Sequence, residues 1–195
     1  ITSLNRLGAN IYRGKVGNKG LSDMLFLSPD REPYRSLKPQ YAALLPWGMR
    51  NAKSDCAELT EGDSLFLDAR ILPHSIVSGI IDRHISSAPR QGRQRRDYKS
   101  REAVEEILYE EAQNSCRENS VLLPRDLRRY GRVYRCAHEM YVSTNFFVIE
   151  GLGEVESRLL ASWMTTVFFQ LSCELFGKNQ EGTRKMERGE LLVPA

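Results

Sequence analysis

The residues of this 195-residue chain best suited to chemistry are arginines and glutamines in the stretch "RQGRQRR", residues 90 to 96. Arg and Gln are the side chains that pair bidentately with guanine or adenine edges in the major groove of DNA. Gly92, between them, allows the backbone to approach a partner closely. Residues 86–99 contain Pro and Gly and show no apolar period, which predicts an exposed basic loop.

Basic residues are unevenly distributed in a chain whose formal net charge is only +3. From residue 83 to 101 seven Lys or Arg accompany the single acid Asp97, and residues 125–135 hold five Arg beside Asp126. A third basic cluster spans residues 178–188. Because Lys and Arg contacts to phosphates supply orientation and nonspecific affinity on duplex DNA, this distribution favours nucleic-acid binding over solvated surface charge. RNA is the less favoured partner.

Two other arrangements suggest metal chemistry. Cys136 and His138 lie two residues apart, but no second pair completes a zinc site. Pro29-Asp30 and Asp97-Tyr98-Lys99 echo the split carboxylate pattern of Mg²⁺-dependent nucleases, in which strands hold two acids close to one ion. Asp97 follows no predicted strand. A small Mg²⁺-dependent endonuclease that uses Asp30 and Asp97 therefore stays as an alternative hypothesis.

The stretch "EGLGEVESRLL", residues 150 to 160, places Gly151 and Gly153 between a predicted strand and a predicted helix. A dinucleotide-binding turn would need a third glycine where Glu156 stands, and Glu154 and Glu156 would repel a phosphate at the helix start. An ordinary strand-to-helix turn is favoured. Since the chain also has no Asn/Asp-Pro-Pro-aromatic loop, a self-contained methyltransferase is not indicated.

Short strands must position the first basic cluster. Apolar alternation or short apolar runs between turn residues predict strands at "NIYRG", "DMLFL", "SLFLDARIL" and "SIVSGII", the last at residues 75 to 81. A helix is predicted from the N-cap Ser100 to the region of Cys116–Asn119, because acids occupy its first turns and an apolar stripe recurs at helical spacing. That stripe consists of Val104, Ile107, Leu108 and Ala112.

The second half of the chain returns to strands at "SVLLP" and at "RVYRCAHEMYVSTNFFVIEG", the latter a long strand or a bent pair. Residues 154–176 then have a helical period, and Gly177 is a natural stop. The order predicts an α+β (mixed α/β) fold with a twisted, largely antiparallel β-sheet core, a mid-chain helix and a long C-terminal packing helix. We expect residues 1–195 to form a single domain, a fragment of a larger protein.

Composition restricts where such a chain acts. Its longest apolar run, residues 159–176, carries too many polar residues to span a bilayer, so no membrane contact is expected. The four cysteines are far apart and form no C-x-x-C pair, which is typical of a reducing compartment. We therefore expect a cytoplasmic protein.

The C-terminal half resembles the target recognition (specificity) domain of adenine-specific DNA methyltransferases in bacterial restriction-modification systems. The resemblance lies in "VLLPRDLRRYGRVYRC", "YVSTNFFVIEG", the helix that follows, and "GTRKMERGELLVP", in that order. The N-terminal stretches "LGANIYRGKVGNKG", "LLPWGMRNAKSD" and "LTEGDSLFL" resemble the same domains more loosely, and "SWMTT" at residues 162 to 166 departs from the family pattern. Both a type I specificity-subunit-like and a fused type IIG-like parent fit.

The resemblance implies a module that recognises double-stranded DNA sequence-specifically and positions it for a methyltransferase domain or subunit. Methyl transfer from S-adenosylmethionine, and cleavage where an endonuclease (restriction) domain is fused, would belong to that partner. This chain would hold no cofactor, no metal and no catalytic residue. The resemblance points to Arg184 and Lys185 in a turn at Gly182, and to Arg125, Arg128 and Arg129 after Pro124, as DNA-binding residues.

The remaining DNA-binding candidates come from the predicted basic loop alone. They are Arg90, Arg93, Gln94, Arg95, Arg96 and Lys99. A third hypothesis is a protein-interaction domain whose helix at residues 154–176 docks on a partner. It requires Trp163, Met164, Phe168 and Phe169 to be exposed rather than in the core.

Overall fold

The computed structural model describes residues 8–17, 21–28, 34–51, 57–86, 100–127, 132–176, 178–180 and 183–185. The strands are β1 (Asn10–Arg13), β2 (Phe26–Leu27), β3 (Trp47–Met49), β4 (Glu58–Leu59), β5 (Ser64–Phe66), β6 (Ser115–Cys116), β7 (Val121–Pro124), β8 (Asp126–Leu127), β9 (Tyr134–Cys136), β10 (Met140–Val142), β11 (Phe146–Glu150), β12 (Lys178–Gln180) and β13 (Thr183–Lys185). The helices are α1 (Ser22–Leu25), the short 3-10 helix η2 (Tyr34–Ser36), α2 (Pro39–Ala42), α3 (His74–Ser86), α4 (Arg101–Glu111), α5 (Glu154–Met164) and α6 (Val167–Phe176).

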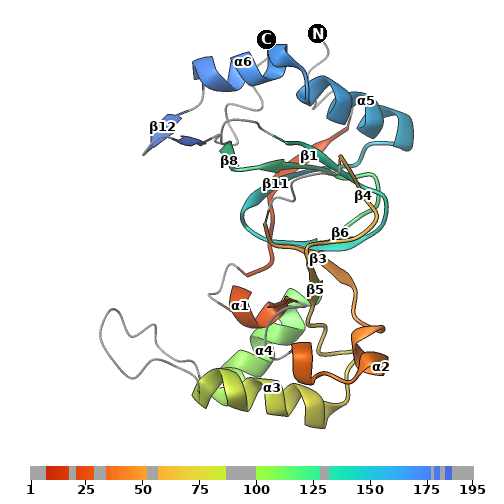
Figure 1. The fold of residues 1–195 in the computed structure, drawn as a ribbon, viewed down its shortest axis with the longest axis vertical. Helices are drawn as coiled ribbons and strands as arrows, with labels where there is room; N and C mark the ends of the chain where they lie inside the picture. The colour runs from red at the N-terminus through yellow and green to blue at the C-terminus, as the bar shows by residue number, and fades with distance from the viewer. Residues whose placement is uncertain are drawn as a thin grey trace.

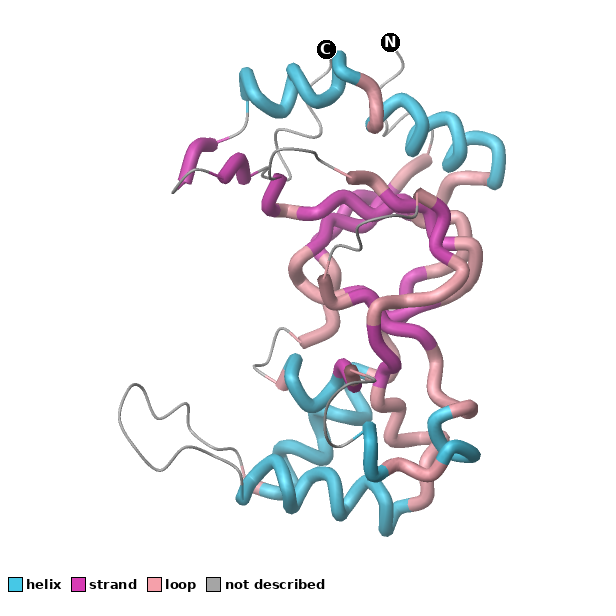
Figure 2. Tube along the Cα trace, in the orientation of Figure 1, coloured by secondary structure: helices cyan, strands magenta, loops and turns pink. Residues whose placement is uncertain are grey.

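These elements form four layers (Figure 1, Figure 2). Two five-stranded sheets face each other in the middle, with strand orders β1-β11-β7-β9-β4 and β2-β5-β3-β10-β6. Helices α5 and α6 cover the outside of the first sheet, and α1 to α4 lie beyond the second (Figure 1). Strands β12, β13 and β8 form a small third sheet. Most pairs are antiparallel, with β3–β10 and β4–β9 parallel, so the expected α+β class with a largely antiparallel core is confirmed.

Strand β11 shows why the sheets stack this way. Phe146 and Val148 point into the core between the two sheets, whereas Phe147 and Ile149 pack toward α5 and α6. A strand buried on both faces has a continuous apolar run, as "FFVI" does. Strand β7 alternates likewise, with Leu122 between the sheets and its neighbours toward the helices.

Helix α3 corrects the prediction of a strand at "SIVSGII". Val77, Ile80 and Ile81 are buried at three- and four-residue spacing, which is a helical stripe. The error arose because a short Val/Ile-rich run fits a buried strand as well as a helix. Helix α3 continues through Ser86 and packs against α4. We call α1 to α4 and the apolar core that they share with the second sheet the α1–α4 lobe.

Helix α4 begins as predicted. Ser100 Oγ accepts a hydrogen bond from the Ala103 amide at 3.3 Å and so caps the first turn. The predicted stripe Val104, Ile107, Leu108 and Ala112 is buried. The helix ends at Glu111, earlier than predicted, because β6 starts at Ser115.

A polar network fastens the end of α4 to the second sheet. Asp68 is almost fully buried and accepts hydrogen bonds from the backbone amide of Arg70 at 2.9 Å and from its side chain at 2.9 and 2.6 Å. Arg70 also donates to the Tyr141 hydroxyl at 3.1 Å, and that hydroxyl donates to the Ala112 carbonyl at 3.0 Å. The ring of Tyr141 stacks on Phe66, with centroids 3.8 Å apart.

The C-terminal helix and two predicted strands also differ from expectation. Residues 154–176 form two helices, because the backbone turns at Thr165 and Thr166, whose hydroxyls donate to carbonyls three residues back at 2.6 and 2.7 Å. "RVYRCAHEMYVSTNFFVIEG" contains three strands, β9, β10 and β11, rather than one or two. "DMLFL" begins with the short helix α1, and only Phe26–Leu27 is strand.

Candidate nucleic-acid interface

The turn at residues 143–145, between β10 and β11, is where three arginine-bearing segments meet. Arg13 Nε donates to the Thr144 carbonyl at 3.0 Å, and the Arg125 amide donates to the Asn145 carbonyl at 2.9 Å. Asn145 Nδ2 and Ser143 Oγ both donate to the Arg50 carbonyl, at 3.0 and 2.9 Å. The ends of β1, β3 and β7 are thereby held together at one end of the sheets.

Two acids at this end stabilise the loop that carries Arg50. Asp63 accepts from the amides of Arg50 and Asn51 at 2.7 and 2.9 Å. Asp23 forms an ion pair with the Arg50 side chain. The Asp63 carboxylate therefore holds the backbone of Arg50 and Asn51 in place. The charge of the Arg50 side chain is balanced by Asp23 instead.

Glycine at position 14 permits the close approach of β1 to the turn. A Cβ built on Gly14 would lie 2.1 Å from the carbonyl oxygen of Ser143. Gly14 also donates to the Phe146 carbonyl at 2.9 Å, which continues the β1–β11 pairing. Arg13 and Lys15, on either side of it, are exposed at this edge.

Arg125 lies beside the strand that carries two further predicted DNA contacts. It is followed at once by β8, and β8 pairs antiparallel with β13, with Asp126 opposite Lys185 and Leu127 opposite Arg184. Arg125 is half-buried, and its Nε is buried without a hydrogen-bond partner among the described residues. The structure thus brings the backbones of Arg125, Arg184 and Lys185 together, although they are far apart in sequence.

The other sequence-predicted residues fall outside the part of the chain that the structure describes. They are Arg90, Arg93, Gln94, Arg95, Arg96, Lys99, Arg128 and Arg129. The turn residue Gly182, the helix stop Gly177, and Asp30 and Asp97 of the nuclease hypothesis are also outside it. The first residue of the predicted basic loop, Ser86, is the last residue of α3. An ion pair of 2.6 Å between Arg101, at the start of α4, and Asp82, near the end of α3, links the two helices.

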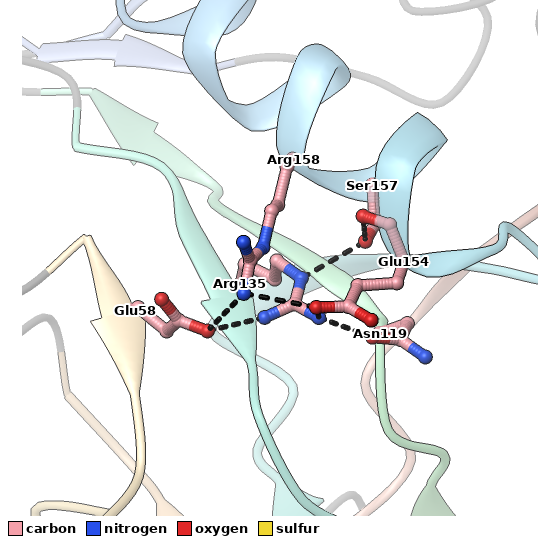
Figure 3. Close-up of polar contacts among 6 residues, drawn as sticks. All are labelled: Glu58, Asn119, Arg135, Glu154, Ser157 and Arg158. Carbon is pink, nitrogen blue, oxygen red and sulfur yellow. Dashed lines mark hydrogen bonds and ion pairs between the residues drawn. The ribbon is translucent and has the colours of Figure 1, made fainter.

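Arg135, which belongs to the second basic cluster, is internal rather than available to a partner. It is 5% exposed, and it donates from Nε to Ser157 Oγ at 2.9 Å (Figure 3). Its two Nη atoms reach Glu58 and Asn119. The side chain thus lies between β9 and α5, where its partner on β7 is the apolar Val121 and its partner on β4 is Glu58.

Arg13, Arg50 and Asn145 are interface candidates that the sequence did not single out. The polar stretch "STN" between two apolar strands was a local signal for an exposed turn. Nothing in the sequence indicated that Arg13 and Arg50 lie at this turn, because the pairings of β1 with β11 and of β3 with β10 join segments distant in sequence.

Metal binding has no support in the described part of the chain. Among those residues no group of three or more His, Cys, Asp or Glu could hold an ion. Cys136 is buried against Cys116, with the two sulfur atoms 4.0 Å apart, while His138 is exposed. The hydrogen bond with the Cys116 thiol, together with burial, raises the pKa of Cys136, which disfavours the thiolate that a metal needs. None of the described helices is long and apolar enough to cross a membrane.

Comparison with known proteins identifies the fold. The family model of the specificity domain of restriction endonuclease BpuSI matches residues 12–193. The chain is also similar to the crystal structure of the type IIG restriction endonuclease BpuSI, with 27% sequence identity and a TM-score of 0.74. That match covers 100% of this chain and 24% of the BpuSI chain, so this chain spans about a quarter of that enzyme's length. A search of curated protein sequences gave no match. The chain therefore belongs to the family of BpuSI-type restriction endonuclease specificity domains.

Proposed function

We propose that this chain recognises a short sequence in duplex DNA for a restriction-modification enzyme and holds it for catalytic domains outside the chain. The observation that carries the proposal is the meeting of Arg13, Arg50 and Arg125 at the 143–145 turn, with strand β13 paired to β8 directly after Arg125. We give the name basic edge to the region formed by Arg13, Lys15, Arg50, Arg125, the 143–145 turn and the backbone of strand β13. Membership of a specificity-domain family supports the same role.

Within the basic edge, cationic side chains contact phosphates. Arg13 and Lys15 are exposed, and the strand of Arg184 and Lys185 runs beside β8. Phosphate contacts of this kind fix the register of a protein on the duplex without reading its sequence. Arg128 and Arg129 are assigned to the same edge because they follow β8 directly.

Base reading is assigned to side chains that can form paired hydrogen bonds. Asn145 is exposed at the turn, and Asn pairs bidentately with adenine in the major groove. Arg90, Arg93, Gln94, Arg95, Arg96 and Lys99 are proposed to contact the duplex from the α3–α4 connection. Arg and Gln suit guanine and adenine edges, and Lys99 suits a phosphate.

Catalysis is assigned to partner domains. Gly151 and Gly153 serve an ordinary turn into α5, whose first turn carries Glu154 and Glu156, so this turn does not suit the anionic group of a nucleotide cofactor. S-adenosylmethionine is therefore proposed for a methyltransferase domain or subunit, and DNA cleavage for an endonuclease domain. We propose that the assembly acts in the cytoplasm, where incoming and chromosomal DNA are both met.

Selection from a pool of duplexes with a randomised centre tests the proposal. The chain is expected to enrich one short motif, and the logarithm of its affinity for that motif should fall linearly with the logarithm of salt concentration. Methyl transfer and cleavage by the chain alone should be absent. Enrichment of no motif at low salt, or methyl transfer by the isolated chain, would contradict the proposal.

A further inference from the structure

Seven large apolar side chains are exposed on helices α5 and α6. The side chains concerned, with their exposed fractions, are Val155 (66%), Leu159 (66%), Trp163 (47%), Val167 (70%), Phe168 (73%), Leu171 (54%) and Leu175 (69%). We call these seven residues the outer helix face. Large apolar side chains scattered singly on a surface are ordinary, but a continuous row of them marks an interaction site.

The spacing of this row shows that both sides of the helices are built for packing. Apolar residues recur at every fourth position from Val155 to Leu175, across the turn at Thr165 and Thr166. The opposite side packs on the first sheet through Ala161, Met164, Phe169 and Cys173. The requirement that Trp163, Met164, Phe168 and Phe169 all be exposed is therefore not met, because Met164 and Phe169 are in the core. Helices that are apolar on both sides are typical of helices buried between two layers, and here the described residues supply one layer only.

The α5 end of the outer helix face is separate from the 143–145 turn of the basic edge, whereas α6 leads through β12 to β13. Strand β11 starts at the 143–145 turn and ends at Glu150, from which the chain turns into α5. The outer helix face offers no cation to a phosphate, since its residues are all apolar. A partner on the α5 end of this face would leave the 143–145 turn open to DNA.

The start of the described chain lies beside this helical layer. Asn10 of β1 pairs with Glu150, and a Cβ on Gly151 would lie 3.0 Å from the Gly8 carbonyl oxygen. Gly8 therefore lies at the N-terminal end of α5. In the similar BpuSI chain, the match to this fold leaves 76% of the chain outside it, because 24% is covered.

We propose that the outer helix face is the docking surface for a catalytic domain of the same polypeptide, which covers it with a complementary apolar surface. The proposal rests on the proposed function, since it takes this chain to be the specificity part of a larger enzyme. Because both helices pack on the first sheet, docking through them would hold the basic edge at a fixed orientation to the catalytic site.

Thiol labelling of single cysteine variants tests this docking. Val167→Cys places a thiol on the outer helix face, and Leu44→Cys, at a 55% exposed position near α2, is the matched control. Each is labelled with a maleimide in the 195-residue chain and in the full polypeptide that carries the flanking domains, and mass spectrometry locates the label. The described native cysteines Cys116, Cys136 and Cys173 are buried.

Val167→Cys is expected to react at least roughly tenfold more slowly in the full polypeptide than in the 195-residue chain, because a tightly docked domain leaves the thiol rarely accessible. Leu44→Cys should react equally in both. Equal rates for Val167→Cys would overturn the proposal. Slow labelling in the 195-residue chain would overturn it too, since the chain or a second copy of it would then cover the face.

A charged double variant separates this proposal from the proposed function. Leu159→Asp with Phe168→Asp is expected to abolish DNA modification by the full polypeptide while leaving DNA binding by the 195-residue chain unchanged. Full modification activity in that variant would contradict docking. If the unsubstituted 195-residue chain does not bind DNA, the proposed function is contradicted, but the labelling result still stands.

Discussion

The guanidinium of Arg135, on β9, donates to the hydroxyl of Ser157, on α5, across 2.9 Å at a site where both residues are buried. Ser157 in turn donates to the Glu154 carbonyl at 2.9 Å, so the arginine is linked to the first turn of the helix. Glu58 and Glu154 supply the opposite charge from its more exposed side (Figure 3). The sheet and the α5–α6 layer are therefore joined by a specific polar contact as well as by apolar packing.

Replacement of Arg135 should cost more stability than replacement of its exposed neighbour Arg158. Arg135→Met is expected to lower the free energy of unfolding by about 2 kcal/mol, because Asn119 and Ser157 lose a buried partner. Arg158→Ala removes an exposed pair with Glu154 at 2.9 Å and should change stability by less than about 0.5 kcal/mol. Urea unfolding measures both. Equal effects would show that the internal contact contributes nothing specific.

Two glycines should respond to alanine in opposite directions. Gly79 lies in α3 with nothing within 4 Å of a built Cβ, so Gly79→Ala is expected to stabilise the chain. The expected gain is about 0.5–1 kcal/mol, from better helix propensity and a less flexible unfolded chain.

Gly14→Ala is expected to destabilise by about 1–3 kcal/mol, because its Cβ would meet the Ser143 carbonyl and push β1 away from the turn. Thermal unfolding of both variants under one buffer condition checks the pair. A neutral Gly14→Ala would show that β1 does not need its close approach to the 143–145 turn.

Acid should lower the stability of the α1–α4 lobe, which the Asp68–Arg70–Tyr141 network links to the second sheet. Burial alone raises the pKa of Asp68, but hydrogen bonds and charge from Arg70 outweigh it and leave the pKa below its ordinary value. A carboxyl group with a lowered pKa stabilises the fold at pH above its unfolded value, and that contribution is lost as pH falls through the folded value. The free energy of unfolding should thus decrease as the pH is lowered from about 5 toward 3.

Two variants test that assignment. Asp68→Asn should be less stable than the parent at neutral pH, and the difference should narrow in acid. Arg70→Met should be less stable at neutral pH and should remove or reverse the acid loss, because burial then raises the pKa of the Asp68 carboxyl and its protonation relieves the destabilisation. Urea unfolding as a function of pH measures all three proteins. Parallel pH profiles would mean that Asp68 does not carry the acid sensitivity.

DNA affinity should depend on which end of the first sheet loses a charge. Arg13→Ala and Arg125→Ala remove cations at the 143–145 turn, whereas Arg117→Ala removes an exposed one near Glu150, at the other end of β11. Each of the first two is expected to weaken binding and to reduce the slope of log affinity against log salt by about 1. The Arg117 variant should bind as the parent does. Equal losses in all three would remove the basic edge as the contact surface.

The sequence predicted those elements whose signals are local. Helix α4 has its Ser100 cap and a regular stripe, and β7 and β11 are short apolar runs next to turn residues. Helix α3 was misread because Val and Ile suit a strand as well as a helix. The break between α5 and α6 was missed, since the hydroxyls of Thr165 and Thr166 that stabilise it look like ordinary polar interruptions.

The site was less accessible to prediction because tertiary contacts decide it. Arg125 and Arg135 belong to one basic cluster in sequence, yet one lies at the basic edge and the other beneath α5. Only the packing of α5 on β9 distinguishes them. The approach of Arg13 and Arg50 to the 143–145 turn likewise depends on strand pairings between distant segments.

The four-layer arrangement has a consequence for how this domain can evolve. The α1–α4 lobe and the α5–α6 layer pack on opposite sides of the paired sheets and belong to separate apolar cores. Mutations that rebuild one lobe therefore need no compensating change in the other. A lineage can therefore change the α3–α4 connection, which we propose contacts the duplex, while the α5–α6 layer that we propose for docking is inherited unchanged.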